Sequence, residues 1–480
     1  MARFVEDRST DTLFVDGSLD SLLPANAMGR VVEAALAGLY FAAFDDRYAN
    51  DAMGRPAVEP RRLAGVWIVA LLHGFLSSVA VTRLCGEDIE FRWLLGDAPV
   101  HKSTLCDFRK RHVEALTELS TQLLAAMARS GQLPGRELVL DGTIVDAASS
   151  CQANVTREQL KRRVKRLKRV IADKLPDPGE SDDATGHLEG RVAKLTGALE
   201  EMDSMGLTKE GSRFTLTEPE ASMKKRKHGG YAPSHNVQAV TDAESGAIVH
   251  VDVIAQGNDQ GQLGPQIEKA MNTLDSVAEH TETTPGPVER IAADCAYHDA
   301  NHLAQLEAQN IRTAVPNGQV HRRVPGQDEA HRSAAFSHDA KTNTLICPSG
   351  ETLKPIGYNR NKTSEKYRAA DAACNACPEK NVCCPNAKGG RTVHHSMHPE
   401  LLARIEEYLQ TPEGERMSHA RQATSEGTFA RLLGLLHWKR CRPWGRSRGQ
   451  AEALWRQIAH NLMLLTGQWK PLVLKPQTEE

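Results

Sequence analysis

The sequence predicts an α/β protein with an all-α N-terminal part and two insertions in its core. Three observations predict this class. Residues 28–130 carry apolar residues at three- and four-residue spacing, which is typical of helices. Between residues 137 and 315, short β-rich runs alternate with helical segments, as in proteins whose strands pair in parallel. Two stretches, 151–231 and 321–399, interrupt this alternation with charged helices and with a cluster of cysteines.

The composition is that of an ordinary globular protein. The chain has 480 residues, 40% of them hydrophobic and 25% charged, which excludes a collagen-like or wholly disordered chain. At about 100–200 residues per domain, this length predicts two to four domains. The formal net charge is −2, so the average does not indicate a nucleic-acid-binding protein, and charge has to be examined segment by segment.

No targeting or membrane-spanning segment is expected. The N-terminal residues lack the basic and apolar regions of a signal peptide. The longest apolar stretch, residues 63–76, is shorter than the roughly 18–20 residues that cross a bilayer, and His73 interrupts it. We therefore expect a buried helix here, and a cytoplasmic protein without membrane contact. In a reducing compartment, clustered cysteines indicate a metal site more often than disulfides.

Residues 1–133 are expected to form the helical N-terminal domain. Within it, the segment 101–112 begins with a serine–threonine pair that can cap a helix and continues into Arg109 and Lys110. A short capped basic helix that follows another helix fits a helix-turn-helix, in which Arg109 and Lys110 would contact DNA. A solvated helix in an ordinary bundle explains the same pattern, and the two interpretations are equally supported.

The core is expected to combine residues 134–150, 232–320 and 400–470. Its predicted elements are, in order, a strand over 137–147, a hairpin over 236–255, a helix over 264–277, strands over 290–294 and 312–316 with a helix between them, and C-terminal helices. The insertion 151–231 predicts a helical hairpin whose first helix is strongly basic. Such a run can contact phosphates, but it is usually a solvated helix face, and we favour that interpretation for most of it.

Three acidic residues form the candidate catalytic and metal-binding set. Asp141 lies within an apolar strand, and Asp294 ends another. A carboxylate in a central strand is costly unless it is paired or binds a metal, although either residue alone could cap the following turn. Glu426 is the only acid in residues 421–448, which hold seven Lys and Arg side chains. A basic helix face binds a polyanion, and carboxylates hold the divalent ions that act on it.

At these residues the sequence resembles the DDE transposases of bacterial insertion sequences. LVLDGTIVDAAS around Asp141 resembles the first acidic motif, IAADCAYHDA around Asp294 the second, and RQATSEGTFARL around Glu426 the third. The stretch that begins RLAGVWIVALLHGFL and ends HKSTLCDFRK resembles the N-terminal domain common in these enzymes. The resemblance covers most of residues 20–465. This sequence departs from the family pattern seven residues beyond Glu426, where the family commonly has a lysine and this chain has Leu433.

The resemblance implies a ribonuclease-H-like core, a mixed sheet with helices, in which Asp141, Asp294 and Glu426 hold Mg²⁺ or Mn²⁺. It implies a transposase that binds terminal inverted repeats, cleaves the DNA and joins its ends to target DNA by two-metal-ion chemistry. We expect a homodimer or higher oligomer on double-stranded DNA, associated with the bacterial nucleoid. Asp146 and Asp259 are rival acids. Besides the two N-terminal residues, the expected DNA contacts are Arg421, Arg431, Lys439, Arg440 and Arg442.

Two other functions stay open: a non-catalytic DNA-binding regulator, such as a domesticated transposase, and a metal-dependent nuclease without strand transfer. An intact acidic triad favours catalysis over a pure binding role. It does not separate strand transfer from simple cleavage.

The cysteine cluster of residues 321–399 resembles a split zinc ribbon. Cys374 and Cys377 form a C-x-x-C pair, and Cys347 and Cys383 are the expected remaining ligands of a tetrahedral four-sulfur zinc site. Cys384 is an alternative to Cys383. An iron–sulfur cluster uses similar ligands, and scattered free thiols explain the same residues without metal. A closed site of this kind predicts a structural role.

Overall fold

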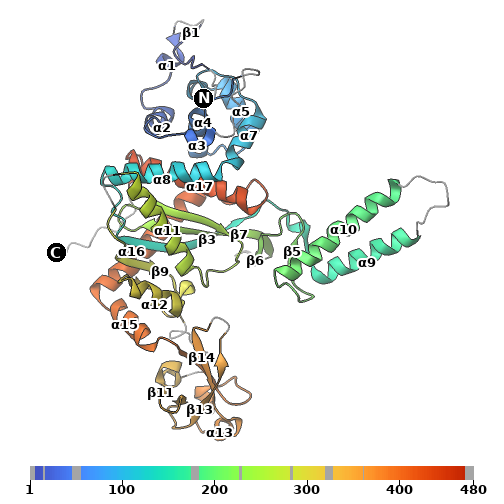
Figure 1. Cartoon of the computed structure of the whole chain (residues 1–480), viewed down its shortest axis with the longest axis vertical. Coiled ribbons are helices and arrows are strands. Elements are labelled where there is room, and N and C mark those ends of the chain that lie inside the picture. The colour runs from blue at the N-terminus through green and yellow to red at the C-terminus, as the bar shows by residue number, and fades with distance from the viewer. Residues whose placement is uncertain are drawn as a thin grey trace.

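A computed structural model describes residues 6–13, 17–45, 56–173, 183–225, 230–281, 285–318, 328–359 and 362–470. Figure 1 shows a central sheet with the N-terminal helices at one end and a cysteine-rich module at the other. A long helical hairpin projects to one side of the sheet. The structure thus confirms an α/β protein with a mainly helical N-terminal part. The expectation of an all-α domain is wrong, because two short strands, β1 (Thr12–Leu13) and β2 (Gly17–Ser18), pair there in antiparallel fashion. None of its described helices is long and apolar enough to cross a membrane.

The central sheet is mixed. Its strands follow the order β10 (Arg312–Ala314), β9 (Arg290–Ala293), β3 (Glu137–Asp146), β7 (Tyr231–Asp242) and β6 (Ser222–Lys225), and β8 (Ile248–Ile254) also pairs with β7. β3 pairs in parallel with β9 and antiparallel with β7. β6 pairs with the first part of β7 and β8 with the remainder, so both cover the same edge of that strand. The predicted hairpin, the strand that contains Asp141 and the strand that ends at Asp294 are confirmed.

Helices cover both faces of this sheet. α8 (Val113–Arg129), α11 (Leu263–Glu279) and the end of α17 (Arg446–Leu465) share an apolar cluster with Leu138, Leu140, Ile291 and Ala293 of the sheet. Side chains alternate between the faces of a strand, so Ala292 points the other way. It packs with Met417 of α16 (Pro412–Phe429) and beside α15 (Pro399–Leu409). α12 (Ala300–Ala308) connects β9 to β10.

The N-terminal helices and the C-terminal helix α17 form one continuous core. The helices are α1 (Leu19–Leu22), α2 (Met28–Leu36), α3 (Ala42–Asp45), α4 (Pro60–Leu72), α5 (Ser78–Glu87), α6 (Ile89–Leu95), α7 (Lys102–Arg111) and α8. α4 is buried almost throughout, as its apolar sequence predicts. Trp67 of α4 and Trp455 of α17 belong to the same apolar cluster. The helices predicted for residues 1–133 therefore pack on the C-terminal helix α17.

The insertion is a hairpin of α9 (Arg157–Asp173) and α10 (Asp183–Ser204) on a base of two short strands, β4 (Asn154–Thr156) and β5 (Arg213–Thr215). Leu160 of α9 and Met202 of α10 are fully buried against each other and Phe214. The two predicted helices are thus confirmed. The residues between these two helices, 174–182, lie outside the described residues.

The cysteine-rich stretch, residues 321–399, holds a sheet of its own. Five antiparallel strands follow chain order: β11 (Ser337–Asp339), β12 (Thr344–Ile346), β13 (Thr352–Tyr358), β14 (Ser364–Arg368) and β15 (Thr392–Ser396). Two short helices, α13 (Asp371–Ala376) and α14 (Lys380–Cys383), lie between β14 and β15. Leu345, Tyr367 and Val393 form its small core. The strands are short and mostly polar, which explains why their pattern did not stand out in the sequence.

Candidate catalytic site

The parallel register of β3 and β9 brings Asp141 and Asp294 together. Val139 pairs with Ala292 and Leu140 with Ala293, so the next position on each strand is an aspartate. Asp141 lies two residues beyond Val139, and Asp294 two beyond Ala292. Both therefore share the face on which Ala292 meets α16. Asp294 also caps the turn that follows, because its carboxylate accepts a hydrogen bond from the Ala296 N–H at 2.6 Å.

Asp141 is held in a setting that opposes its negative charge. Burial raises the pKa of this carboxyl, the Gly142 N–H and the Arg421 guanidinium lower it, and the nearby Asp294 carboxylate raises it again; the net shift is upward. Arg421 of α16 approaches Asp141 to 3.7 Å, and the Gly142 N–H donates to Asp141 at 2.7 Å. Two carboxylates crowded together in a partly buried place favour a bound cation.

Glu426 lies one residue beyond the buried Ser425 on α16, the helix that covers this face. Its own side chain is exposed and accepts a hydrogen bond from Gln422 at 3.2 Å. Over the described residues, no group of three His, Cys, Asp or Glu side chains has the arrangement of a formed metal site. The structure thus pairs the two aspartates and sets the helix of Glu426 beside them, without joining the three carboxylates.

A buried polar network borders Asp141 on its other side. The Asp259 carboxylate accepts hydrogen bonds from the Asn236 and Gln238 side chains, both at 2.8 Å. The Tyr297 hydroxyl donates to Gln238 Oε1 at 2.6 Å. Burial raises the pKa of Tyr297, and the charges of Asp259, Asp141 and Asp294 raise it further, which places all three acids near this hydroxyl.

Of the two rival acids, Asp259 therefore borders the site. Asp146 lies five residues beyond Asp141 on the same strand, so its side chain leaves the opposite face. Its backbone pairs with the segment after α16, where the Asp146 N–H donates to Lys439 O at 3.2 Å. Sequence reasoning missed the roles of Gln238 and Tyr297. The Gly that follows Asp141 was the available signal, since a glycine in a strand often marks a close approach.

Two parts of the chain match known protein families. Residues 17–111 match the family described as a transposase domain, and residues 346–466 match the transposase DDE domain. Two separate parts of the chain are thus similar to transposases, and the C-terminal part is similar to their DDE domain. The first match covers the N-terminal helices, and the second runs from the cysteine-rich module through α16 to α17. No curated protein matches the chain.

Two of the basic residues expected to contact DNA are buried inside the protein. Arg109 of α7 is buried, forms an ion pair with the fully buried Glu452 of α17, and lies over the Trp67 ring at 4.7 Å. Arg431 is buried as well; its guanidinium donates to Lys470 O and lies over the Trp469 ring at 5.2 Å. These two expectations are corrected, because both guanidinium groups are engaged inside the protein.

The other basic residues vary in their exposure. Lys439 and Arg442 are exposed. Arg440 donates to the carbonyl oxygens of Ala147, Ala148 and Ser149 at 2.9–3.0 Å, so it also fastens its segment to the end of β3. Lys110 is half-buried and pairs with Asp107 at 3.2 Å. Contact with DNA stays a prediction for these residues and for Arg421.

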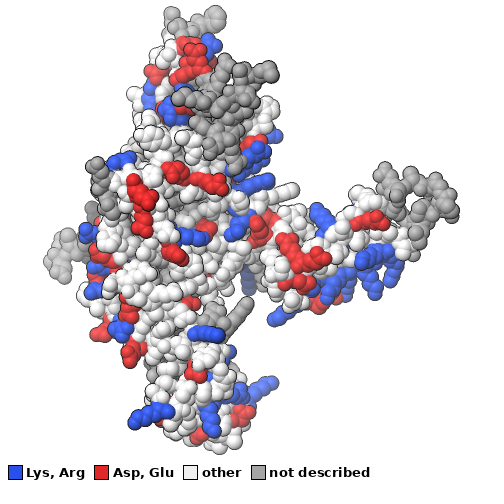
Figure 2. Space-filling view, viewed as in Figure 1, with Lys and Arg blue, Asp and Glu red and all other residues white. Residues whose placement is uncertain are grey.

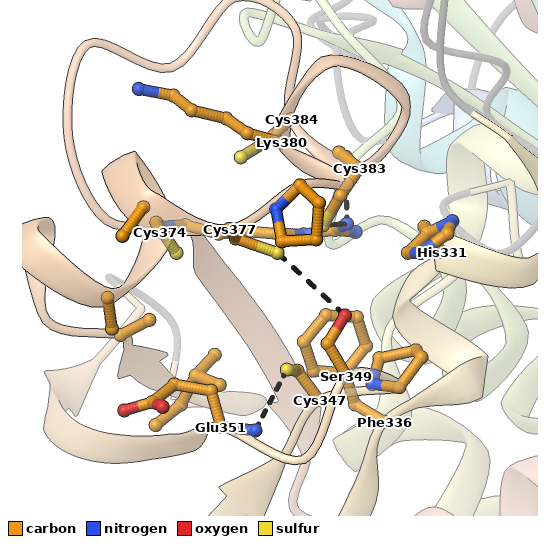
Figure 3. A pocket seen from close by; sticks show the side chains of 17 residues that line it. His331, Phe336, Cys347, Ser349, Glu351, Cys374, Cys377, Lys380, Cys383 and Cys384 are labelled. Atoms are coloured by element: carbon orange, nitrogen blue, oxygen red, sulfur yellow. Dashed lines mark hydrogen bonds between the residues drawn. The ribbon is translucent and has the colours of Figure 1, made fainter.

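Five of the ten cysteines gather around one cavity of about 220 Å³ in the cysteine-rich module, drawn in Figure 3. Cys347, Cys374, Cys377, Cys383 and Cys384 all line it, and none of them forms a disulfide. Burial and the neighbouring thiols of Cys383 and Cys374 raise the pKa of Cys384 to about 11. The Cys383 sulfur accepts a hydrogen bond from the Arg391 guanidinium at 3.0 Å. The expected ligands therefore share a cavity but are not arranged as a formed metal site.

Proposed function

We propose that this chain is an active DNA transposase that binds the terminal inverted repeats of an insertion sequence, cleaves the DNA and joins its ends to target DNA. The observation that carries the proposal is the register that sets Asp141 beside Asp294 under α16. A pure DNA-binding protein has no need of two adjacent, partly buried carboxylates, because such a pair costs stability unless a cation binds.

The sheet topology supports a ribonuclease-H-like core. Strands β8, β7, β3, β9 and β10 lie side by side in that order, with β7 antiparallel to its neighbours and the last three mutually parallel. The two aspartates occupy the central strand and the next one. In such a core, α16 would bring the third acid across the sheet.

Asp141, Asp294 and Glu426 would hold Mg²⁺ or Mn²⁺ in this proposal. Carboxylate oxygens are the ligands these hard ions prefer. The raised pKa of Asp141 means that its ionised carboxylate is disfavoured, and a bound cation would stabilise that ionised form. When bound, the divalent ions activate a water or a DNA hydroxyl and stabilise the leaving oxygen. Glu426 turns from Gln422 toward the aspartates, Arg421 neutralises phosphate charge, and Gln238 and Tyr297 hold Gly142 and Asp141 in place.

The transposase experiment uses DNA that carries the element's flanking repeats. With Mg²⁺, the wild-type protein should cut at the repeat ends, and Asp294→Asn should reduce the cleavage rate by at least about 100-fold, as expected for loss of a metal ligand. Asp275→Asn, an exposed residue of α11, is the matched control and should cut normally. Repeat binding that persists in the wild type without any cleavage would instead favour the non-catalytic regulator.

We also propose a structural zinc ion in the cysteine cavity. Cys347, Cys374, Cys377 and either Cys383 or Cys384 would bind it, since four thiolates suit tetrahedral zinc. The module's core is small, so a closed metal site would stabilise it. Metal analysis of the purified protein should give one zinc per chain. A metal-free protein whose five cavity thiols react freely with an alkylating agent contradicts the assignment.

A further inference from the structure

The outer face of α9 is the most basic surface that the catalytic site leaves unexplained. α9 holds eight Lys and Arg residues and two acids, a net charge of +6 in 17 residues, whereas the whole chain has a net charge of −2. Seven of the eight, all between positions 161 and 169, are exposed. Figure 2 shows them gathered along the side of the hairpin that faces away from α10.

The opposite face of α9 is used for folding. Leu160 is fully buried and packs toward Met202 and Ala198 of α10. The apolar side of the helix packs on α10. The basic side therefore faces solvent. The exposed charge thus covers the part of the helix surface that does not pack on α10.

Most of this charge is not neutralised within the protein. Lys161 pairs with Glu210 at 2.5 Å and Arg162 with Glu158 at 2.6 Å. Among the described residues, the other five have no ion-pair partner: Arg163, Lys165, Arg166, Lys168 and Arg169. Like charges three and four positions apart destabilise a helix by about 0.2–0.5 kcal/mol per pair. A binding polyanion removes this repulsion.

We infer that the α9 face is a second DNA-binding surface. It contacts the phosphate backbone of a duplex at a place separate from the catalytic site. The basic stretch from 161 to 169 is about 12 Å long, at 1.5 Å per residue. This length equals the rise of three to four nucleotides of one DNA strand. The side chains present no fixed hydrogen-bonding pattern for base edges, so the contact is expected to be independent of sequence.

The position of the hairpin fits this role. Its base begins directly after β3, the strand that carries Asp141, and it returns to the sheet through β6, which pairs with the start of β7. Figure 1 shows the hairpin extending sideways from that end of the sheet. DNA that lies across the candidate site and continues along β3 therefore meets α9. The inference rests on the proposed function only in taking DNA as the polyanion.

The experiment measures the salt dependence of DNA binding by the full-length protein, with a duplex that carries the flanking repeats and with an unrelated duplex. Arg166→Gln/Arg169→Gln removes two charges from the α9 face. Gln has a helix propensity close to that of Arg, so the hairpin should stay folded, which circular dichroism checks. Arg191→Gln/Lys194→Gln, two exposed residues of α10, is the matched control with the same charge change.

The slope of log affinity against log salt should fall by about 0.9 for each lost phosphate contact, so by up to about 2 in the α9 variant, on both duplexes. The α10 control should keep the wild-type slope. An unchanged slope in the α9 variant, or an equal loss in both variants, overturns the inference. An unchanged slope is also the result expected if the partner of this surface is an acidic protein and not DNA. If the α9 variant loses slope while the wild type never cleaves DNA, the surface is right and the proposed catalysis is wrong.

Discussion

Gly142 has room for no side chain, and this makes it a sensitive probe of the site. A Cβ atom at this position would lie 2.6 Å from Gln238 Nε2, 2.8 Å from the Tyr297 hydroxyl and 3.0 Å from Asp259 Oδ1. The first two groups are buried and hydrogen-bonded to each other, so they have little freedom to move. Any added atom must displace the network or β3 itself, and with it Asp141.

We therefore expect Gly142→Ala to lower DNA cleavage by at least about 10-fold, because displacements near 1 Å in a catalytic group have large effects. DNA affinity should change little, since phosphate contacts come from Lys and Arg. Gly190→Ala is the control: it lies in α10, and a Cβ there meets nothing within 4 Å. Normal cleavage by Gly142→Ala would mean that the network does not position Asp141.

His460 predicts a pH dependence of stability. It is fully buried in α17, where its Nε2 donates to Gly246 O at 2.9 Å, whereas its Nδ1 has no partner among the described residues. Burial lowers its pKa to about 4, from an ordinary value near 6.5. A group whose pKa is lowered on folding stabilises the protein above its unfolded pKa. This contribution is lost as the pH falls from about 6.5 toward 4.

The midpoint temperature of thermal unfolding should therefore decrease as the pH is lowered from 7 to 5. His460→Gln removes this titration but still offers a donor to Gly246 O, so its midpoint should depend less on pH over the same interval. His250 of β8, with a pKa also lowered to about 4 by burial, would account for some remaining dependence. Equal pH dependence in the wild type and the variant contradicts a neutral buried His460.

At the scale of elements, α7 is where the sequence and the structure differ most. Its basic run allowed either a DNA-reading helix or an ordinary bundle helix, and Arg109 takes a structural part. Its partner Glu452 is 343 residues away in the sequence, so no local pattern indicates the pair. Arg431 was misassigned for the same reason, because its contacts lie near the C-terminal end of the described chain.

Arg109→Ala should destabilise the protein by about 1.5–3 kcal/mol, because it removes one of the two charge partners of the buried Glu452 and leaves Arg456, at 3.4 Å, as the other. Arg109→Met/Glu452→Met should be more destabilised than the single variant, because it leaves the fully buried Arg456 without its carboxylate partner. Urea unfolding measures both. A single variant of normal stability that binds DNA weakly would restore Arg109 as a surface contact.

Other elements were predictable because their signals are local. The unbroken apolar run of α4, the amphipathic pattern of the α9–α10 hairpin and the β-rich runs of β3, β7 and β8 all appear as expected. The strands of the cysteine-rich module were not predicted, since they are three to seven residues long and largely exposed. Their sheet is defined by pairing and by a small core, which a sequence pattern does not display.

At the scale of the whole molecule, the candidate site draws on three segments separated by 153 and 132 residues, from positions 141, 294 and 426. The motifs named the three acids, and the register of β3 and β9 accounts for the meeting of two of them. The polar network with Gln238, Tyr297 and Asp259 was not predicted in full, because its members come from separate strands and turns. The continuous core between the N-terminal helices and α17 likewise depends on tertiary packing.

The most direct test of the central claim is to map where a bound divalent ion sits. Fe²⁺ in place of Mg²⁺, with ascorbate and peroxide, generates hydroxyl radicals that cut the polypeptide next to the ion. Cuts are expected beside Asp141, beside Asp294 and in α16 at Glu426, all suppressed by excess Mg²⁺ and by Asp294→Asn. Cuts at the two aspartates with none in α16, or cuts only at the cysteine cavity that Mg²⁺ does not suppress, would contradict a single site built from the three acids.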